Sequence, residues 1–407
     1  MQITRRGWLA LAPAAVAAAE WTQWRGPQRS GLAEDVSLPQ SWPAELRRLW
    51  RVEVGEGHSS PVVSGDRIFA FSREGDRETL RALQLSDGKE LWKQSYAAPY
   101  EMNSAARAHG EGPKSTPLIH EGRLYTLGIS GILSCWQAAT GELLWRKEFA
   151  ERFRTTSPLY GAALSPVAAG GLLFVHVGGH DDGALLALEP EGGEERWSWT
   201  ADGPGYASPI IAELAGFQQV ITLTQGTAVG LDAPSGRALW RVPLETPYDQ
   251  NAVTPVVSEN LVILSGYQGR TFAVRIIKKT GTPTAEEVWS NDEVPMYMSS
   301  PVVRGGFLYG FTHKRRGALF CLGAKTGELQ WIGDGRAGDN ASLTIAGEWL
   351  LALNTDGAVS IVRPNPERLD VVKEYEVADS PVWASPALTE QSLLVKDFDG
   401  LTRWSWG

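Results

Sequence analysis

The feature that most constrains the fold of this chain is a short unit that recurs at fixed spacing. In each copy a small residue lies ten positions before a Trp, and a Gly lies four positions before the same Trp. Five copies keep both offsets: Ala82/Gly88/Trp92, Cys135/Gly141/Trp145, Ala187/Gly193/Trp197, Gly230/Gly236/Trp240 and Cys321/Gly327/Trp331. Such repetition is typical of folds in which each unit packs against its neighbours. We therefore expect one repeat domain within the 407 residues.

Most units begin with a Ser-Pro or Thr-Pro pair that is followed by apolar residues. Seven pairs start at Ser60, Thr116, Ser165, Ser208, Thr254, Ser300 and Ser385, and an eighth start, Ser342, lacks the Pro. The intervals of 42 to 56 residues between these starts are typical of a four-stranded propeller blade. In blade six, for example, strands are expected at 300–303, 307–310, 318–322 and 328–331.

The last unit supplies only three strands before Gly407, with Trp404 in the small-residue register. The missing outer strand is predicted around Trp50, so the N-terminal and C-terminal segments would share a blade and close the ring. We predict an all-β, eight-bladed propeller over 46–407 after an extended lead-in over 20–45. Blade seven departs from the repeat because Val371 stands where Trp is expected, and blade five has a longer outer turn.

The recurring Gly and Trp have structural roles in this interpretation. The Gly lies in a turn between the third and outer strands, where one residue needs a positive φ. Each outer-strand Trp is expected to wedge against the neighbouring blade; these are Trp50, Trp92, Trp145, Trp197, Trp240, Trp289 and Trp331. Cys135 and Cys321 occupy the small-residue register in blades two and six, too far apart for a disulfide, so we expect two free buried thiols.

Residues 1–19 resemble an export signal of the twin-arginine type. Arg5 and Arg6 precede an apolar run that ends in small residues, which suits cleavage and is too short to span a bilayer. The alternative is a disordered apolar N-terminus. The formal net charge of −9 disfavours nucleic acid and anionic membranes as partners. We expect a periplasmic or secreted monomer without a transmembrane span.

The repeat, from Ala/Gly through Thr/Ser-Gly to Trp, resembles the tryptophan-docking motif of quinoprotein-type propellers, the pyrroloquinoline-quinone repeat family. The similarity covers nearly the whole chain after residue 19, and 24–27, 112–117 and 295–301 are similar to exported bacterial members. The family includes quinone-dependent alcohol and sugar dehydrogenases, and non-enzymatic relatives such as an outer-membrane-protein assembly factor. The dehydrogenases usually carry a vicinal cysteine pair and calcium ligands, and this sequence has no Cys-Cys pair.

Propellers bind ligands at the funnel mouth, where the loops leading into the innermost strands meet the turns between second and third strands. The loops supply the candidates His58, Lys114, Tyr206, Asn251, Tyr297, Asn340 and Trp383. The opposing turns add His180, Asp181, Asp182, Gln268, His313, Lys314 and Asp397. Two longer loops carry Glu101, Asn103, Arg107, His109, Arg152, Arg154 and Tyr160. Long loops tend to be functional, so we expect these two loops to form a lid over the funnel. The alternative is that they only fill the channel, with their polar groups satisfying one another.

The sequence favours a non-catalytic periplasmic or secreted propeller that binds a ligand or a protein partner at its funnel face. The alternative is a pyrroloquinoline-quinone-dependent dehydrogenase acting on an alcohol or sugar. That reading needs the quinone with calcium, Asp181 or Asp397 as base, and Arg107 or Lys114 pairing with cofactor carboxylates. His180-Asp181-Asp182 is expected to be a polar turn rather than a cation site, because adjacent residues do not by themselves converge on one ion. His176, on an apolar strand, is expected to be a satisfied buried histidine.

Overall fold

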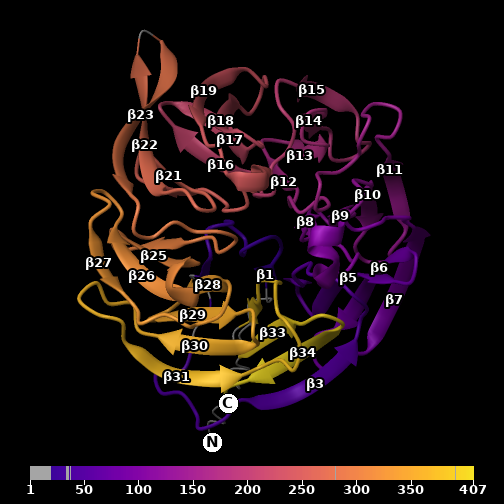
Figure 1. The fold of residues 1–407 in the computed structure, drawn as a ribbon. Helices are drawn as coiled ribbons and strands as arrows, with labels where there is room; N and C mark the ends of the chain where they lie inside the picture. The colour runs from indigo at the N-terminus through magenta and orange to yellow at the C-terminus, as the bar shows by residue number, and fades with distance from the viewer. Residues whose placement is uncertain (1–19, 34–35, 37, 280, 390) are drawn as a thin grey trace, which may run out of the picture.

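The computed structural model describes residues 20–33, 36, 38–279, 281–389 and 391–407. These residues form eight sheets, which are arranged as blades around a central axis (Figure 1). The eight-bladed propeller predicted from the repeat spacing is therefore confirmed. The export signal predicted over 1–19 lies outside the described residues.

The first four blades each run from the innermost to the outermost strand in chain order. They comprise β4 (Val62–Ser64), β5 (Arg67–Glu74), β6 (Arg77–Gln84) and β7 (Glu90–Ala97); β8 (Leu118–His120), β9 (Arg123–Leu127), β10 (Leu133–Gln137) and β11 (Leu143–Lys147); β12 (Val167–Ala169), β13 (Leu172–Gly178), β14 (Gly183–Leu188) and β15 (Glu195–Trp199); and β16 (Ile210–Leu214), β17 (Phe217–Leu223), β18 (Thr227–Asp232) and β19 (Ala238–Pro243).

Blades five to seven repeat this order. They comprise β20 (Val256–Ser258), β21 (Leu261–Ser265), β22 (Thr271–Lys279) and β23 (Thr282–Asn291); β24 (Val302–Arg304), β25 (Phe307–Thr312), β26 (Ala318–Gly323) and β27 (Leu329–Ile332); and β28 (Ala341–Ala346), β29 (Trp349–Asn354), β30 (Ala358–Val362) and β31 (Val371–Glu376). The long β22–β23 hairpin projects from the ring at the top left of Figure 1. Among the described residues, short 3-10 helices lie in three loops: η1 (Ser104–His109), η2 (Pro247–Asp249) and η3 (Lys314–Arg316).

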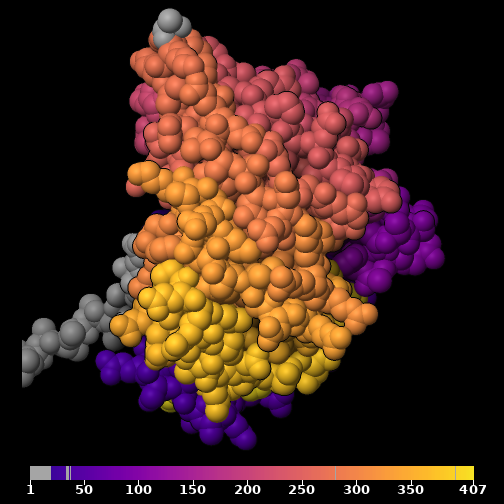
Figure 2. Space-filling model, turned by 60° about the vertical axis from the view of Figure 1, so that its left-hand side comes forward, coloured from indigo at the N-terminus to yellow at the C-terminus, as the bar shows by residue number. Residues whose placement is uncertain are grey.

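Blade eight is built from both ends of the chain. Its inner strands are β32 (Ala387–Thr389), β33 (Ser392–Lys396) and β34 (Gly400–Ser405), and its outer strand is β3 (Arg47–Glu53). β3 pairs antiparallel with β34, so that Trp50 lies opposite Arg403. The indigo N-terminal and yellow C-terminal segments accordingly lie side by side in Figures 1 and 2. This pairing closes the ring and leaves no exposed edge on β34.

The register corrects two assignments made from the sequence. In blades one to six the small residue lies opposite the Trp and is followed by a β-bulge, as at Cys135 and Trp145. In blade seven the bulge follows Ile361, which lies opposite Lys373, so Lys373 and not Val371 holds the Trp position. The turn between β30 and β31 is longer than in the other short-turn blades, so the Trp position lies further along the chain than the usual offset of ten residues. In blade eight the small-residue register belongs to Arg403, and not to Trp404.

Six of the predicted docking tryptophans bind the next blade in the same way. The indole Nε1 of Trp50, Trp92, Trp145, Trp197, Trp289 and Trp331 donates to a backbone carbonyl at 2.7–3.2 Å, on Leu85, Ala138, Pro190, Ala233, Ala324 and Asn365 respectively. In five of these pairs the ring also covers the recurring Gly of the next blade. The indole thus fixes the spacing of adjacent blades, both by packing over the glycine and by the hydrogen bond from Nε1.

Trp240 differs from the other six. Its Nε1 donates 2.7 Å to Gln219 Oε1 of its own blade, and its ring lies over Gly230. Blade five, the next blade, has the extended β22–β23 hairpin in place of the short glycine turn. Without that platform the indole packs inward, where it is 5% exposed.

The Ser-Pro and Thr-Pro pairs form a ring of hydrogen bonds around the central channel. At five of the eight blade starts the backbone N–H donates to the hydroxyl of the next blade's Ser or Thr, at 2.8–3.3 Å: Ser60 to Thr116, Thr116 to Ser165, Ser165 to Ser208, Thr254 to Ser300, and Ser385 to Ser60. The following Pro has no N–H to satisfy. The sequence pair is therefore an inter-blade joint.

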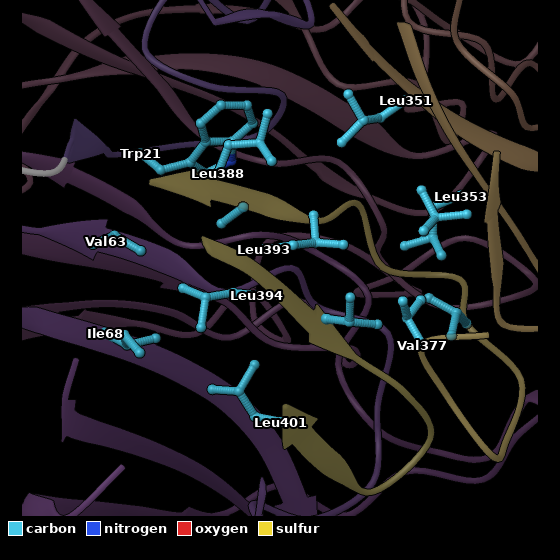
Figure 3. Close-up of a cluster of buried hydrophobic side chains, with 14 of the residues drawn as sticks. Trp21, Val63, Ile68, Leu351, Leu353, Val377, Leu388, Leu393, Leu394 and Leu401 are labelled. Atoms are coloured by element: carbon cyan, nitrogen blue, oxygen red, sulfur yellow. The ribbon is translucent and has the colours of Figure 1, made fainter. Parts of the chain in front are cut away.

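The segment before β3 enters the centre of the ring. β1 (Glu20–Trp21) pairs antiparallel with β4, and β2 (Leu32–Ala33) pairs parallel with β28. Trp21 is 1% exposed and lies beside Leu388 in an apolar cluster (Figure 3). Between β1 and β2 the chain contacts inner-strand starts in blades three, five and six. We call residues 22–31 the plug.

Candidate functional site

Aromatic and histidine side chains gather in three groups at the loops that lead into the innermost strands. The first group contains His58, His109, Trp383 and Phe398. The His109 and Trp383 rings lie 4.7 Å apart between centroids, and His58 Nε2 is 2.9 Å from the His109 carbonyl. Burial, with a smaller effect of the Lys114 charge, lowers the pKa of His58 to about 3. His58 is therefore neutral at physiological pH and acts as a packed polar group.

The second group joins the loops of blades three and four. The Tyr206 hydroxyl accepts from the Tyr160 backbone N–H at 3.3 Å and lies 3.1 Å from His180 Nε2. Lys114 donates 2.8 Å to the Tyr160 carbonyl, and burial lowers the pKa of Lys114 to about 8. Burial also raises the pKa of Tyr206. These contacts tie the loops of blades two, three and four together.

The third group spans blades five and six. The Tyr267 and Tyr297 ring centroids are 4.3 Å apart, and His313 lies 5.2 Å from Tyr267. Burial, with a contribution from neighbouring tyrosines including Tyr160, raises the pKa of Tyr297 to about 12. Sequence reasoning named Gln268 and missed Tyr267, its neighbour in the same turn.

Two predicted site residues have structural roles. Asn251 is fully buried, and its amide donates to the carbonyls of Thr224, Gln225 and Leu244. Asn340 Oδ1 accepts from the Met298 backbone N–H at 3.2 Å. The Asn251 amide is fully used in joining blades four and five, so it is not available to a ligand.

The two long loops pack against each other. Met102, Ala106 and Ile129 are buried together, with Tyr100 and Tyr160 partly covering them. Asn103 caps η1 by accepting from the Ala105 N–H at 3.0 Å, while Arg107 is exposed. The loops therefore pack into one ordered unit at the side of the funnel mouth.

Exposed apolar groups stand on this same side. Tyr248 is 70% exposed and Leu159, next to Tyr160, is 49% exposed. Tyr248 and Asp249 both have positive φ values, 62° and 56°, which non-glycine residues adopt rarely and at a cost. The Tyr206 backbone N–H donates 2.9 Å to the carbonyl of Asn251, two residues after η2 ends, which places η2 close to the second group in the chain. We call Leu159 and Tyr248 the rim; nothing in the sequence pattern distinguished them.

A polar groove of about 480 Å³ lies between blades three and four and includes His180, Asp181 and Asp182. His180 Nδ1 lies 3.1 Å from the Pro204 carbonyl, Asp181 accepts from Gln225, and Asp182 accepts from the Arg154 N–H. The three side chains thus face three different partners. Across the described ranges, no three His, Cys, Asp or Glu side chains come together as metal ligands.

The residues suggested for a quinone with calcium do not fit that group. Asp397 is engaged by Arg51 at 2.5 Å and by the Gly400 N–H, and its side chain is 1% exposed. Lys114 is occupied by a backbone carbonyl and Arg107 points into solvent. Cys135 and Cys321 are free and buried in different blades, as predicted, and burial raises their thiol pKa values to about 11 and 12. In the described part of the chain, no helix is long and apolar enough to cross a membrane.

The family profile and the sequence relatives that match this chain carry the same description. A family profile described as outer membrane protein assembly factor BamB matches residues 76–333. The chain is 25% identical to BamB of Shewanella oneidensis over 70% of this chain and 72% of the relative, and 23% identical to BamB of Burkholderia pseudomallei over 79% and 88%.

Solved structures share the fold at lower sequence identity. BamB from Moraxella catarrhalis matches with a TM-score of 0.63 and 16% identity, covering 89% of this chain and 98% of the other. A quinohemoprotein alcohol dehydrogenase from Pseudomonas putida matches with a TM-score of 0.66 and 13% identity, covering 96% and 80%. At these sequence identities the structural matches support the propeller fold and no shared function.

Proposed function

The chain belongs to the pyrroloquinoline-quinone repeat family described as outer membrane protein assembly factor BamB, and from that premise we propose that it is a non-catalytic propeller that binds a partner protein at its funnel face. Its sequence relatives named above are assembly factors. We further propose that it works as a monomer in the periplasm or outside the cell, on the outer-membrane assembly route named by those relatives. The export-like sequence of 1–19 supports this location.

The observation that carries the proposal is the rim. Tyr248 is 70% exposed although aromatic side chains normally gain from burial, and it is held there by a strained backbone. Contiguous exposed apolar patches mark interaction sites, and tyrosine is enriched among the residues that dominate binding energy. Behind the rim, Tyr160 and Tyr206 provide a packed support. This arrangement suits a broad protein contact.

The funnel residues support binding rather than catalysis. A general base needs a pKa near the working pH and a free lone pair. His58 has a pKa of about 3 and is packed against His109 and Trp383. His180 has both ring nitrogens within hydrogen-bond distance of protein groups. The two carboxylates named as bases for a quinone-dependent dehydrogenase, Asp397 and Asp181, are engaged by Arg51 and Gln225 respectively, so that alternative is not proposed.

The test is co-purification from the cell envelope of the source organism. The full chain is compared with a rim variant carrying Leu159→Ser and Tyr248→Ser. We expect the full chain to retain proteins of outer-membrane assembly, identified by mass spectrometry, and the rim variant to lose them at least tenfold, as expected when anchors are truncated.

The control removes two other exposed apolar side chains, on the outer strand of blade seven. Val371→Ser with Val372→Ser changes residues that are 43% and 41% exposed on β31. This variant should retain the same proteins as the full chain. Equal recovery by the rim variant and the control variant would rule out the rim as the binding face.

A further inference from the structure

The plug carries two arginines into the interior of the ring. Arg25 and Arg29 are 3% and 4% exposed. Arg25 Nη2 donates to the Ser30 carbonyl at 3.2 Å and to the Pro301 carbonyl. Arg29 donates to the carbonyls of Ser165 and Pro166 at 3.0 and 2.7 Å. These bonds position both guanidinium groups but bring no negative charge.

The two positive charges have no acidic partner in the part of the chain that the structure describes. Burial lowers the pKa of each arginine to about 9, and the charge of Arg25 further lowers that of Arg29. Buried charges are normally paired, because an isolated ion loses its hydration without compensation. Two neighbouring cations in one channel therefore call for an anion.

A cavity of about 50 Å³ adjoins Arg25. Arg25 and Trp24 line it from the plug, Ser300 from the hydroxyl ring, and Asn340, Thr355 and Trp383 from the funnel side. Arg25 Nη1 and Thr355 Oγ1 are both buried without a hydrogen-bond partner among the described residues. Buried polar atoms rarely lack a partner, and here a guanidinium donor and a hydroxyl line the same cavity.

The size of the cavity restricts what it can hold. A buried water needs roughly 10–15 Å³ of such space, so 50 Å³ accommodates a compact ion. Pockets for drug-sized ligands or organic cofactors enclose about 300–1,000 Å³. A three-ring quinone is therefore too large for this cavity.

We propose that the cavity binds one small oxyanion, with Arg25 as the charged donor, Thr355 as a hydroxyl donor and Arg29 adding positive potential. A planar guanidinium matches the paired oxygens of phosphate, sulfate or a carboxylate. The anion reaches the site from the funnel past Trp383 and Asn340. It offsets positive charge of the plug and links the plug to blades six and seven. The site lies away from the rim, so it does not depend on the partner proposed above.

The test is thermal unfolding and calorimetric titration of the protein with sodium phosphate, sulfate or acetate, each at an ionic strength matched with sodium chloride. We expect a saturable rise in the unfolding midpoint and one anion bound per chain, since a ligand that binds only the folded state stabilises it. Preference for phosphate or sulfate assigns the site to a free tetrahedral anion, and preference for acetate assigns it to a carboxylate. No binding beyond the chloride background overturns the proposal.

Two variants locate the site and one controls for charge. Arg25→Gln should abolish the response, and Thr355→Val, which keeps the side-chain volume, should weaken the affinity about tenfold. Arg196→Gln on β15 removes an arginine whose side chain is 60% exposed and should bind as the parent protein does. If Arg25→Gln does not fold, Thr355→Val decides. Unchanged affinity in Thr355→Val places any bound anion elsewhere and overturns the assignment.

Discussion

His176 shows how the interior treats a single ionisable residue. It lies on β13, is 1% exposed, and its ring nitrogens are each 3.3 Å from an acceptor or hydroxyl, on Thr222 and Asp202. Burial lowers its pKa to about 4. The hydrogen bond to the Asp202 carbonyl and the charge of Asp202 raise the pKa, but by less than burial lowers it. The interpretation of His176 as a satisfied buried histidine is confirmed. Its neutral ring joins blades three and four.

We predict that His176 makes the protein sensitive to mild acid. Because its folded pKa of about 4 lies below the ordinary histidine pKa of about 6.5, the unfolded chain binds a proton first as the pH falls. The contribution is fully present above pH 6.5 and is lost as the pH falls toward 4. At pH 5 the loss is about 2 kcal/mol. Urea unfolding at pH 7.5 and 5 should show a smaller loss in His176→Gln by that amount; identical losses would refute the assignment.

At the scale of elements, the outer turn and the neighbouring Trp act as one joint. The turn before β11 places Gly141 at a φ of +76°, and a Cβ there would lie 2.7 Å from the Trp92 ring. The Gly is thus required both by the turn and by the indole of the preceding blade. Two constraints on one residue explain why the spacing of Gly and Trp is so regular.

This joint also explains what the sequence could predict. A unit that must offer a turn glycine and an indole at fixed offsets is visible in one sequence, so the blade count follows. The inward packing of Trp240 is not visible, because it depends on the missing platform in blade five and on Gln219 being within reach. In blade seven, spacing alone misplaced the Trp position, since a longer turn before Lys373 changes the register.

Gly141→Ala is predicted to destabilise the protein more than Gly65→Ala. Both positions have positive φ, but a Cβ at Gly65 meets nothing within 4 Å. The left-handed conformation costs a non-glycine residue about 1–2 kcal/mol, and overpacking adds about 1–3 kcal/mol at Gly141. Chemical denaturation should therefore show Gly141→Ala to be the less stable variant by about 1–3 kcal/mol. Equal losses would mean that the Trp92 ring moves aside freely.

At the scale of the whole molecule, the plug is the part that the sequence did not reveal. Residues 20–45 are predicted from the sequence as an extended lead-in, and the structure adds that 20–33 pair with blades one and seven and bond to the inner-strand starts of blades three, five and six. The signal was present: from Trp21 to Ala33 inclusive, the chain has two arginines, two tryptophans and no acid. No local rule places such a segment inside a ring, because the channel exists only after all eight blades have assembled.

At the funnel, too, the sequence predicts the positions of the loops but not the surroundings of each side chain. The repeat placed Tyr206, Tyr297 and Trp383 in the loops that lead into the innermost strands, where the structure has them, and their binding of a ligand stays a prediction. The repeat does not report how far a side chain stands from the surface, so Tyr248 and Leu159 were missed. It also cannot separate Asn251, whose amide is consumed by three carbonyls, from a group that is free to bind.

Ring closure and plug should contribute separately to stability, and two truncations distinguish them. A chain that begins at residue 46 loses the plug but retains β3, whereas a chain that begins at residue 55 also loses β3. The second exposes the edge of β34 and removes the hydrogen bond from Trp50 to Leu85. An unpaired strand edge promotes association between molecules.

We expect the chain from 46 to unfold cooperatively at a lower temperature than the chain from 20, because it loses the buried Trp21 side chain, which is worth roughly 3–5 kcal/mol by the large-to-small rule. The chain from 55 should unfold at a still lower temperature and should form oligomers. Scanning calorimetry with size-exclusion chromatography measures both effects. If the two truncated chains melted together and stayed monomeric, β3 would be a covering strand rather than the closure of the ring.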